Sequence, residues 1–270
     1  MGDPIYHLDL RVERCRARIR VNDLPFGELI AAGEQPEWFA PPMNPYLVGS
    51  GNLVQVEVEP AFDDEGTATE IAEAVVELAV VRVERGGVVA PGEGDRVTTY
   101  AVGPELAQNI RDAEEADEEL EIPQTFFFLF DNEGARFDGT IRDDLPYGNQ
   151  AALRTYAIRL RDLVRAGDVV GLVAEMEPKV LAYAEAYSDD AGRIRDSLAE
   201  TLRDRIFPAG PTTEFEAPDV RLVSLAGGRI WELRKPDGRP LISTEPDEHG
   251  GTYQIPILVA ETDGTLRVVR

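Results

Sequence analysis

The two histidines, His7 and His249, are the residues best suited to acid–base or metal chemistry at neutral pH. They lie far apart in the sequence, so a helical His-Glu-x-x-His zinc site is impossible. His249 stands in the peptide Asp247-Glu-His-Gly-Gly251, whose composition predicts an exposed loop. A histidine-based catalytic triad would have to use one of the two, and neither context favours it.

The single cysteine, Cys15, excludes an internal disulfide and a thiolate zinc cluster. The positive charges of Arg14 and Arg16 on either side could lower its pKa and make it reactive. The alternative is an ordinary strand or turn cysteine, which we favour because no second thiol could resolve an oxidised form. One cysteine and no secretion signal in residues 1–6 together favour a cytoplasmic protein.

The remaining candidate motifs are incomplete. Gly49-Ser-Gly51 and Gly92-Glu-Gly94 complete neither a phosphate loop nor a dinucleotide fingerprint. Asp131-Asn-Glu-Gly134 with Asp138 offers oxygen ligands, but their spacing misses the calcium-loop pattern. Carboxylates are so numerous that no acid–base pair stands out. We therefore predict no catalytic, cofactor-binding or metal-binding residues and no cofactor, and we favour a protein that is not an enzyme.

The elements that would position any site begin with one helical block, residues 149–207. Residues 150–165 carry apolar side chains at helical spacing. Gly167 is placed to end that helix, Asp168 to cap the next, and Pro178 to begin a third. The last helix is predicted to start at Ser188 or Asp189. Its apolar residues are spaced by four: Ile194, Leu198, Leu202 and Ile206.

Period-two alternation predicts strands on both sides of this block. The predicted strands before it cover residues 5–12, 16–21, 24–26, 53–59, 74–85 and 122–130, and those after it cover 219–225, 229–234, 241–245, 253–261 and 266–270. Residues 33–42 are predicted to be a loop in which Trp38 and Phe39 are anchored. Residues 105–119 form either an acidic helix, with Leu106, Ile110 and Ala113 as its apolar stripe, or an acidic loop.

A domain boundary is predicted near residues 143–146. The first domain, 1–145, contains Ile19-Arg-Val-Asn-Asp-Leu-Pro-Phe26, Asn44-Pro-Tyr-Leu-Val48 and Gly51-Asn-Leu-Val-Gln-Val-Glu-Val58. On these peptides, about its first 85 residues resemble jelly-roll β-sandwiches of the galactose-binding type, which implies an all-β fold. No sugar-binding residues match, so the resemblance implies no carbohydrate ligand.

The second domain, 146–270, has helices followed by a β-meander, which is typical of an α+β fold. It resembles the cone-shaped fold of the nuclear-transport-factor-2-like superfamily. The resemblance rests on Leu153-Arg-Thr-Tyr-Ala-Ile-Arg-Leu-Arg-Asp-Leu163 with Ala166-Gly-Asp168, on the hairpin at residues 234–242, and on the closing residues 260–268. It implies helices packed on an antiparallel sheet. No catalytic motif of the superfamily is present. Tyr156, Trp231 and Tyr253 could line the cone, although core packing is the better interpretation for each.

The charge is unevenly distributed. The chain carries a net charge of −24, and residues 1–145 hold 31 acids against 11 bases. Such a surface repels nucleic acid and anionic membranes and attracts a basic protein. An acidic stretch of this kind also simply favours solubility. Arginine far outnumbers lysine, which stands only at positions 179 and 235, and this bias is typical of a GC-rich genome.

Two functions follow from these patterns. The first is a non-enzymatic interaction protein of bacterial type, whose acidic first domain binds a basic partner; an immunity or antitoxin role is one concrete version. The second is a small-molecule binder or enzyme that uses the cavity of the second domain.

Overall fold

The computed structural model describes residues 4–63, 65–84, 90, 92–134, 148–246 and 252–270. The chain divides into two compact units, Met1–Asp138 and Gly139–Arg270, called unit 1 and unit 2 below. The predicted boundary peptide, residues 143–146, lies outside the described residues. The domain limits at 145 and 146 therefore stay a prediction. The described residues combine several antiparallel sheets with helices, as the sequence predicts at the level of fold class.

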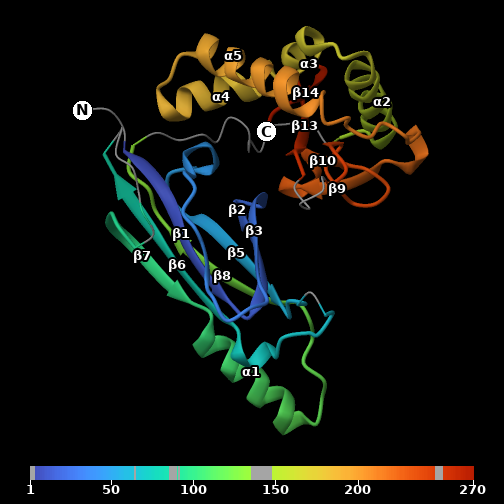
Figure 1. Ribbon diagram of the computed structural model, residues 1–270. Coiled ribbons are helices and arrows are strands. Elements are labelled where there is room, and N and C mark those ends of the chain that lie inside the picture. Colours follow the sequence, from blue (N-terminus) through green and yellow to red (C-terminus); the bar gives the residue numbers. More distant parts are fainter. Residues whose placement is uncertain (1–3, 64, 85–89, 91, 135–147, 247–251) are drawn as a thin grey trace. The chain divides into compact units, whose positions relative to one another are not determined.

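Unit 1 contains two four-stranded antiparallel sheets within its described residues, ordered β4-β1-β6-β7 and β3-β2-β5-β8. Figure 1 shows them as two layers, with helix α1 beyond one end of the strands. The strands are β1 (Ile5–Glu13), β2 (Cys15–Val21), β3 (Leu24–Ala31), β4 (Glu37–Phe39), β5 (Asn52–Glu59), β6 (Val75–Val83), β7 (Asp95–Ala101) and β8 (Gln124–Phe130).

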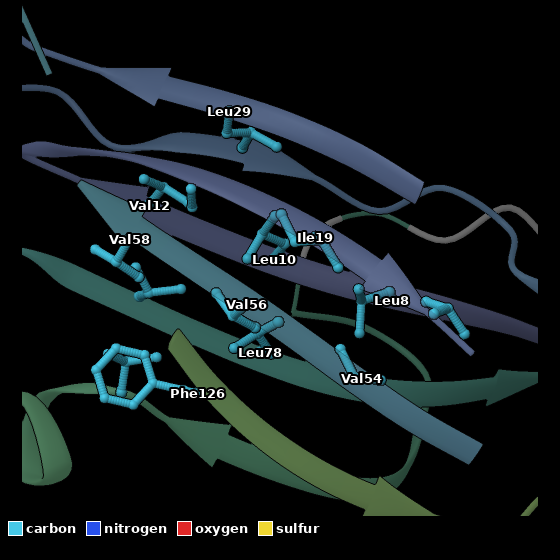
Figure 2. Packing of buried hydrophobic residues seen from close by; sticks show 14 of the residues in the cluster. Leu8, Leu10, Val12, Ile19, Leu29, Val54, Val56, Val58, Leu78 and Phe126 are labelled. Carbon is cyan, nitrogen blue, oxygen red and sulfur yellow. The ribbon is translucent and has the colours of Figure 1, made fainter. Parts of the chain in front are cut away.

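One apolar core lies between the two layers (Figure 2). Alternate residues of β1, β2, β5, β6 and β8 point into it, as period-two patterning predicts. Tyr6, Leu8 and Leu10 of β1 and Ile19 of β2 are all buried in this cluster. Phe126 of β8, 2% exposed, joins them. The intervening residues consequently face away from the core on both sheets.

The end of β8 is held by Asn52, which is fully buried. Its amide nitrogen donates hydrogen bonds to the carbonyl oxygens of Gly49 and Phe130, at 3.1 and 3.2 Å, and to Asn132 Oδ1 at 3.0 Å. Its Oδ1 accepts hydrogen bonds from Val48 N at 2.8 Å and from the Asn22 amide at 3.1 Å. A buried amide with this many partners fixes the loops that it joins. It therefore sets where β8 ends.

Helix α1 (Gly103–Ala116) forms in the acidic stretch, so the helical alternative is the one that the structure adopts. Leu106 is buried in the core of unit 1, and Ile110 packs against it. The rest of the helix is largely exposed, because only this narrow apolar stripe packs against the core.

The helices of unit 2 begin and end close to the predicted residues: α2 (Gln150–Ala166), α3 (Val169–Glu175), α4 (Glu177–Tyr187) and α5 (Ala191–Thr201), the last continued by a π-helical turn (Leu202–Ile206). Asn149 caps α2 by accepting hydrogen bonds from two backbone N–H groups, and Gly167 ends it in the left-handed conformation. Asp168 caps α3, and Pro178 lies in the first turn of α4. Helix α5 is capped by Asp190, one residue beyond the predicted start.

The strands of unit 2 that follow the helices are β9 (Arg221–Leu225), β10 (Ile230–Arg234), β11 (Ile242–Ser243), β12 (Gln254–Ile255), β13 (Ile257–Thr262) and β14 (Thr265–Val268). Four of them form an antiparallel sheet ordered β14-β13-β10-β9, and β11 pairs with β12. One core cluster contains Leu153 and Leu160 of α2 together with Leu233, Ile257 and Val268 of the sheet. The sheet thus covers the apolar stripes of the helices.

Several elements differ from the predictions. Residues 37–39 form a short strand, β4, on the edge of β1, and Trp38 and Phe39 are 45% and 41% exposed rather than anchored. Strand β7 was not indicated by the sequence, because a polar edge strand lacks clear alternation. In the helix that Pro178 begins, the apolar pattern predicts Leu181 in a buried stripe, but Leu181 is 51% exposed on α4. Among the described residues, no helix is long and apolar enough to cross a membrane.

Replacing Phe126 by alanine should cost about 3–5 kcal/mol of unfolding free energy, because it leaves a cavity between the two sheets. The neighbouring change Phe127→Ala should cost less than about 1 kcal/mol, since Phe127 is 54% exposed on the opposite face. Urea unfolding of both variants, with hydrogen exchange of β5 peptides reporting on unit 1, measures the difference. Equal losses for the two variants would contradict the register of β8.

Candidate interaction surface

The structure describes one of the two histidines considered as candidates. His7 lies half-buried on the outer face of β1, and its Nδ1 is 2.8 Å from the carbonyl oxygen of Ala40. His249 lies outside the described residues. Across the part of the chain that the structure describes, no group of three or more His, Cys, Asp and Glu side chains could hold a metal ion.

Cys15 is fully buried at the start of β2. Burial raises the pKa of its thiol to about 12, because the thiolate would lose its hydration. The neighbouring arginines do not lower it: Arg14 pairs with Glu73, and Arg16 pairs with Glu28 and Glu59. The structural interpretation of Cys15 is therefore the one that its environment supports.

The three aromatic residues considered for the cone do not converge on a cavity. Tyr156 is buried in the core of unit 2, where its hydroxyl donates a hydrogen bond to Glu175 Oε2 at 2.7 Å. Trp231 packs against the same core and donates from Nε1 to the carbonyl oxygen of Gly228 at 2.8 Å. Tyr253 is 44% exposed. The predicted cavity function gains no support from these residues and stays a prediction.

The side chains of the loop after β8 are already used within unit 1. Asp131 Oδ1 accepts a hydrogen bond from Gly51 N at 2.7 Å, and Asn132 belongs to the Asn52 network. Glu133 forms an ion pair with Arg82 at 3.2 Å. Asp138, the fifth candidate oxygen ligand, lies outside the described residues. The described part of the loop therefore has a structural role: its side chains hold it to the neighbouring turn.

The outer face of β8 is unusual because it is apolar and exposed. Phe127 and Leu129 point away from the core and are 54% and 65% exposed. Leu53 of β5, 36% exposed, lies directly opposite Leu129. These three side chains form a continuous apolar row, called the β8 row below. Large apolar side chains gathered on a surface typically mark a binding surface.

Strand β8 is also an edge strand. It pairs with β5 on one side, and no strand pairs with its other side among the described residues. The row of N–H and C=O groups along that side could pair with an added strand. Two of the three side chains of the β8 row, Phe127 and Leu129, lie on the strand that offers this edge.

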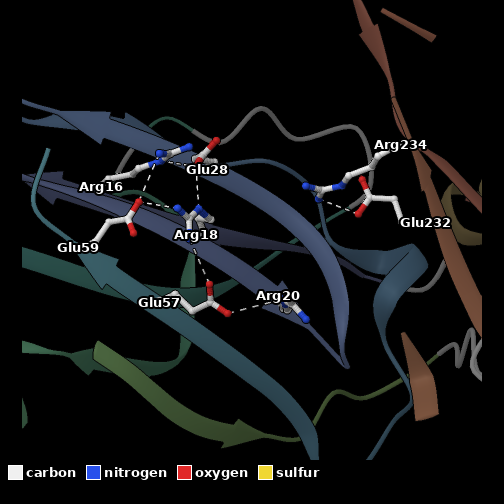
Figure 3. A network of polar contacts seen from close by, with 8 residues as sticks. All are labelled: Arg16, Arg18, Arg20, Glu28, Glu57, Glu59, Glu232 and Arg234. Carbon is white, nitrogen blue, oxygen red and sulfur yellow. Dashed lines mark hydrogen bonds and ion pairs between the residues drawn. The ribbon is translucent and has the colours of Figure 1, made fainter. Parts of the chain in front are cut away.

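The rest of this face is charged but balanced. Arg16, Arg18 and Arg20 of β2 lie between glutamates of the two neighbouring strands (Figure 3). Arg18 contacts Glu28 at 3.1 Å and Glu57 at 3.4 Å. Exposed pairs of this kind contribute little to stability. Their effect is to neutralise the centre of the sheet, which leaves the negative charge of unit 1 elsewhere.

Much of that charge lies next to the start of β8. Residues 103–121 contain eight acids and one base. Asn109 of α1 donates a hydrogen bond to Gln124 Oε1 of β8 at 2.7 Å, which places the helix beside the strand. A shallow depression of about 390 Å³ lies between them, and its acidic lining residues are Asp112, Glu118, Glu119 and Glu121. An acidic surface therefore adjoins the start of strand β8.

Sequence reasoning found the strand but missed the surface. The run Thr125-Phe-Phe-Phe-Leu-Phe130 is apolar at both even and odd positions, so alternation cannot show which side chains face outward. The available signal was the absence of alternation itself. In a sheet with one solvated face, such a run predicts either burial on both faces or an exposed apolar row.

Lys235 is another group that the sequence did not single out. It is 3% exposed, and its ammonium donates hydrogen bonds to Thr212 Oγ1 and, at 2.8 Å, to the carbonyl oxygen of Ser243. Burial lowers the pKa of this lysine to about 8. Both contacts join the 235–240 turn to neighbouring segments of unit 2, which gives the side chain a structural role.

Comparison of the chain with protein-family models, with curated proteins and with solved structures found no match. The features that bear on function are therefore those of the molecule itself: the β8 row, the free edge of β8 and the adjoining acidic helix.

The thiol of Cys15 should be inert in the folded chain. At pH 8 a pKa of about 12 makes its thiolate roughly 1,000-fold scarcer than that of an unperturbed thiol with a pKa of 9.0. Labelling with iodoacetamide should be slower by at least 100-fold in buffer than in 8 M urea, where one equivalent reacts. Stoichiometric labelling of the folded chain at the rate of an ordinary thiol would contradict this assignment.

Proposed function

We propose that the protein is a non-enzymatic interaction module whose unit 1 binds a basic protein partner. The observation that carries the proposal is the exposed β8 row on a free strand edge, beside the acidic helix α1. Each of these three features has a separate physical consequence for the partner.

The β8 row supplies the apolar contact. Fully burying an exposed apolar side chain contributes roughly 1.5–3 kcal/mol, and Phe127, Leu129 and Leu53 each contribute less because they are 54%, 65% and 36% exposed. Association costs several kcal/mol in lost translational and rotational freedom. The row alone therefore gives weak binding, and a second contribution is required.

The free edge of β8 supplies this second contribution to binding, and it also fixes the direction in which the bound segment runs. An extended segment that pairs with β8 satisfies the backbone groups along the edge, and alternate side chains of the segment lie on the same face as the β8 row. The segment we propose is an extended strand with apolar residues at alternate positions.

The acidic helix supplies the charge preference. The eight acids of residues 103–121 lie towards the start of β8, so basic residues of the partner are expected at the end of the segment that lies there. Charge complementarity of this kind raises the association rate and excludes acidic partners. An inhibitor that covers a basic protein, such as an immunity or antitoxin protein, is the most specific form of this proposal.

We also propose a specific fold for each unit and a cellular location for the protein. Two packed antiparallel sheets support a jelly-roll-like sandwich for unit 1, and helices that share a core with an antiparallel sheet support a cone fold for unit 2. The buried, unpaired Cys15 suits the reducing cytoplasm of a bacterium.

The test compares capture of proteins from a native bacterial lysate by the intact chain and by variants. The double change Phe127→Ser with Leu129→Ser should weaken binding of the captured basic partner at least tenfold, because the apolar contact is lost. The matched control is Ile30→Ser, which changes a 51% exposed side chain on β3, the opposite edge of the same sheet. It should leave capture unchanged.

A second arm tests the charge. Raising the salt from 0.1 M to 1 M shortens the Debye length from about 10 Å to 3 Å, and capture should fall accordingly. Replacing Glu118, Glu119 and Glu121 by glutamine should weaken capture at low salt only. The proposal fails if the β8 double variant and the Ile30 control capture the same proteins equally well, or if the captured partner is acidic.

A further inference from the structure

A second site lies on the other sheet of unit 1. On the outer face of β4-β1-β6-β7, three small residues lie near one another: Ala79, Thr99 and Ala101. Ala79 pairs with Thr99, and Ala101 pairs with Glu77, two residues before Ala79. Asp9 lies on the other side of Ala79. The lack of large side chains here leaves an open depression of about 370 Å³, which Trp38 and Arg96 also line. A volume of this size admits a small organic molecule.

Asp9 is the unusual residue of this depression. It is only 6% exposed although it points away from the apolar core. Its Oδ2 accepts one hydrogen bond from Gly92 N at 2.8 Å, whereas its Oδ1 is buried and has no hydrogen-bond partner among the described residues. Buried carboxylate oxygens in folded proteins almost always have a partner. Asp9 lines the depression, so a ligand bound there could donate the hydrogen bond that this oxygen lacks.

The other carboxylate of the depression is already neutralised. Glu77 forms an ion pair with Arg11 at 2.9 Å, and Arg11 also pairs with Glu13. The Arg11 guanidinium lies over the Trp38 ring, 5.5 Å from its centroid. Arg11 and Trp38 therefore line this side of the depression, and the charge of Glu77 is already neutralised by Arg11. Asp9 is therefore the anionic group available to a ligand.

Arg96 provides an available positive charge. It is exposed on β7, and it forms no ion pair with the described residues. It pairs in register with Val81 of β6, which pairs with His7 of β1, two residues before Asp9. Since neighbouring strands lie about 4.8 Å apart, the backbones of Asp9 and Arg96 are roughly 10 Å or more apart across the sheet. That separation leaves room for a small molecule between an anionic and a cationic group.

We propose that this depression binds a small zwitterion, a free α-amino acid, with its ammonium group on Asp9 and its carboxylate on Arg96. The ammonium donates to Asp9 Oδ1 and supplies the missing partner. The Arg96 guanidinium receives the carboxylate, which is the geometry that arginine favours. The nonpolar part of the ligand lies over Ala79 and towards Trp38. The β8 row belongs to the other sheet, so this inference is independent of the proposed function.

The experiment screens the twenty L-amino acids against the full chain by thermal-shift measurement and follows the best with isothermal titration calorimetry. At least one should raise the unfolding midpoint by 2 °C or more and bind with a Kd below 1 mM. The N-acetyl and the amide forms of that amino acid should bind at least tenfold more weakly, because each lacks one of the two charges. Binding of the N-acetyl form as tight as that of the parent overturns the proposal, as does the absence of any binding below 10 mM.

Three variants separate binding from folding. Asp9→Asn and Arg96→Gln should each weaken binding at least tenfold, and Ala79→Leu should abolish it by filling the depression. The matched control is Arg111→Gln, an exposed arginine on α1, which should bind as the original chain does. Without ligand, Asp9→Asn should unfold at the same temperature or a higher one, since it removes a buried unpartnered charge. Unchanged binding in both Asp9→Asn and Ala79→Leu overturns the site.

Discussion

The apolar core between the two sheets of unit 1 is the constraint on which the other features of that unit depend. Because a strand alternates its side chains between two faces, packing Leu8, Ile19, Val56 and Phe126 into one core determines the outward position of every neighbour. The register of β5 against β8 then places Leu53 opposite Leu129 without any further interaction. A slip of one residue would bury the β8 row and expose the core residues.

The two sites are departures from what this constraint favours. Outward positions of a solvated sheet are normally polar and able to meet water. Phe127 and Leu129 are outward and apolar, and Asp9 is outward, charged and buried. Neither arrangement stabilises the isolated chain. The exposed Phe127 and Leu129 leave apolar surface in water, and the burial of Asp9 removes a carboxylate from water. Such departures are expected where a protein binds something that completes the interaction.

Local patterns account for the parts of the structure that the sequence predicted. The alternation of residues 5–12, the left-handed Gly167 and the capping Asp168 are decided by near neighbours, and all three have the predicted structure. The orientation of Phe127 depends instead on pairing with β5, more than seventy residues earlier in the chain. The burial of Asp9 depends on Gly92, which lies 83 residues later in the chain, and on small side chains of β6 and β7. Contacts of this range leave no periodic signal in the sequence, which is why neither site could be read from it.

Amide hydrogen exchange can decide whether the free edge of β8 is a binding surface. The measurement compares exchange of residues 124–130 in the intact chain alone and with an excess of the purified basic partner at 0.1 M salt. Exchange in β8 should become at least tenfold slower on binding, with no change in β3, the opposite edge of the same sheet. Protection confined to other elements, with β8 exchanging at its original rate in the complex, would contradict it.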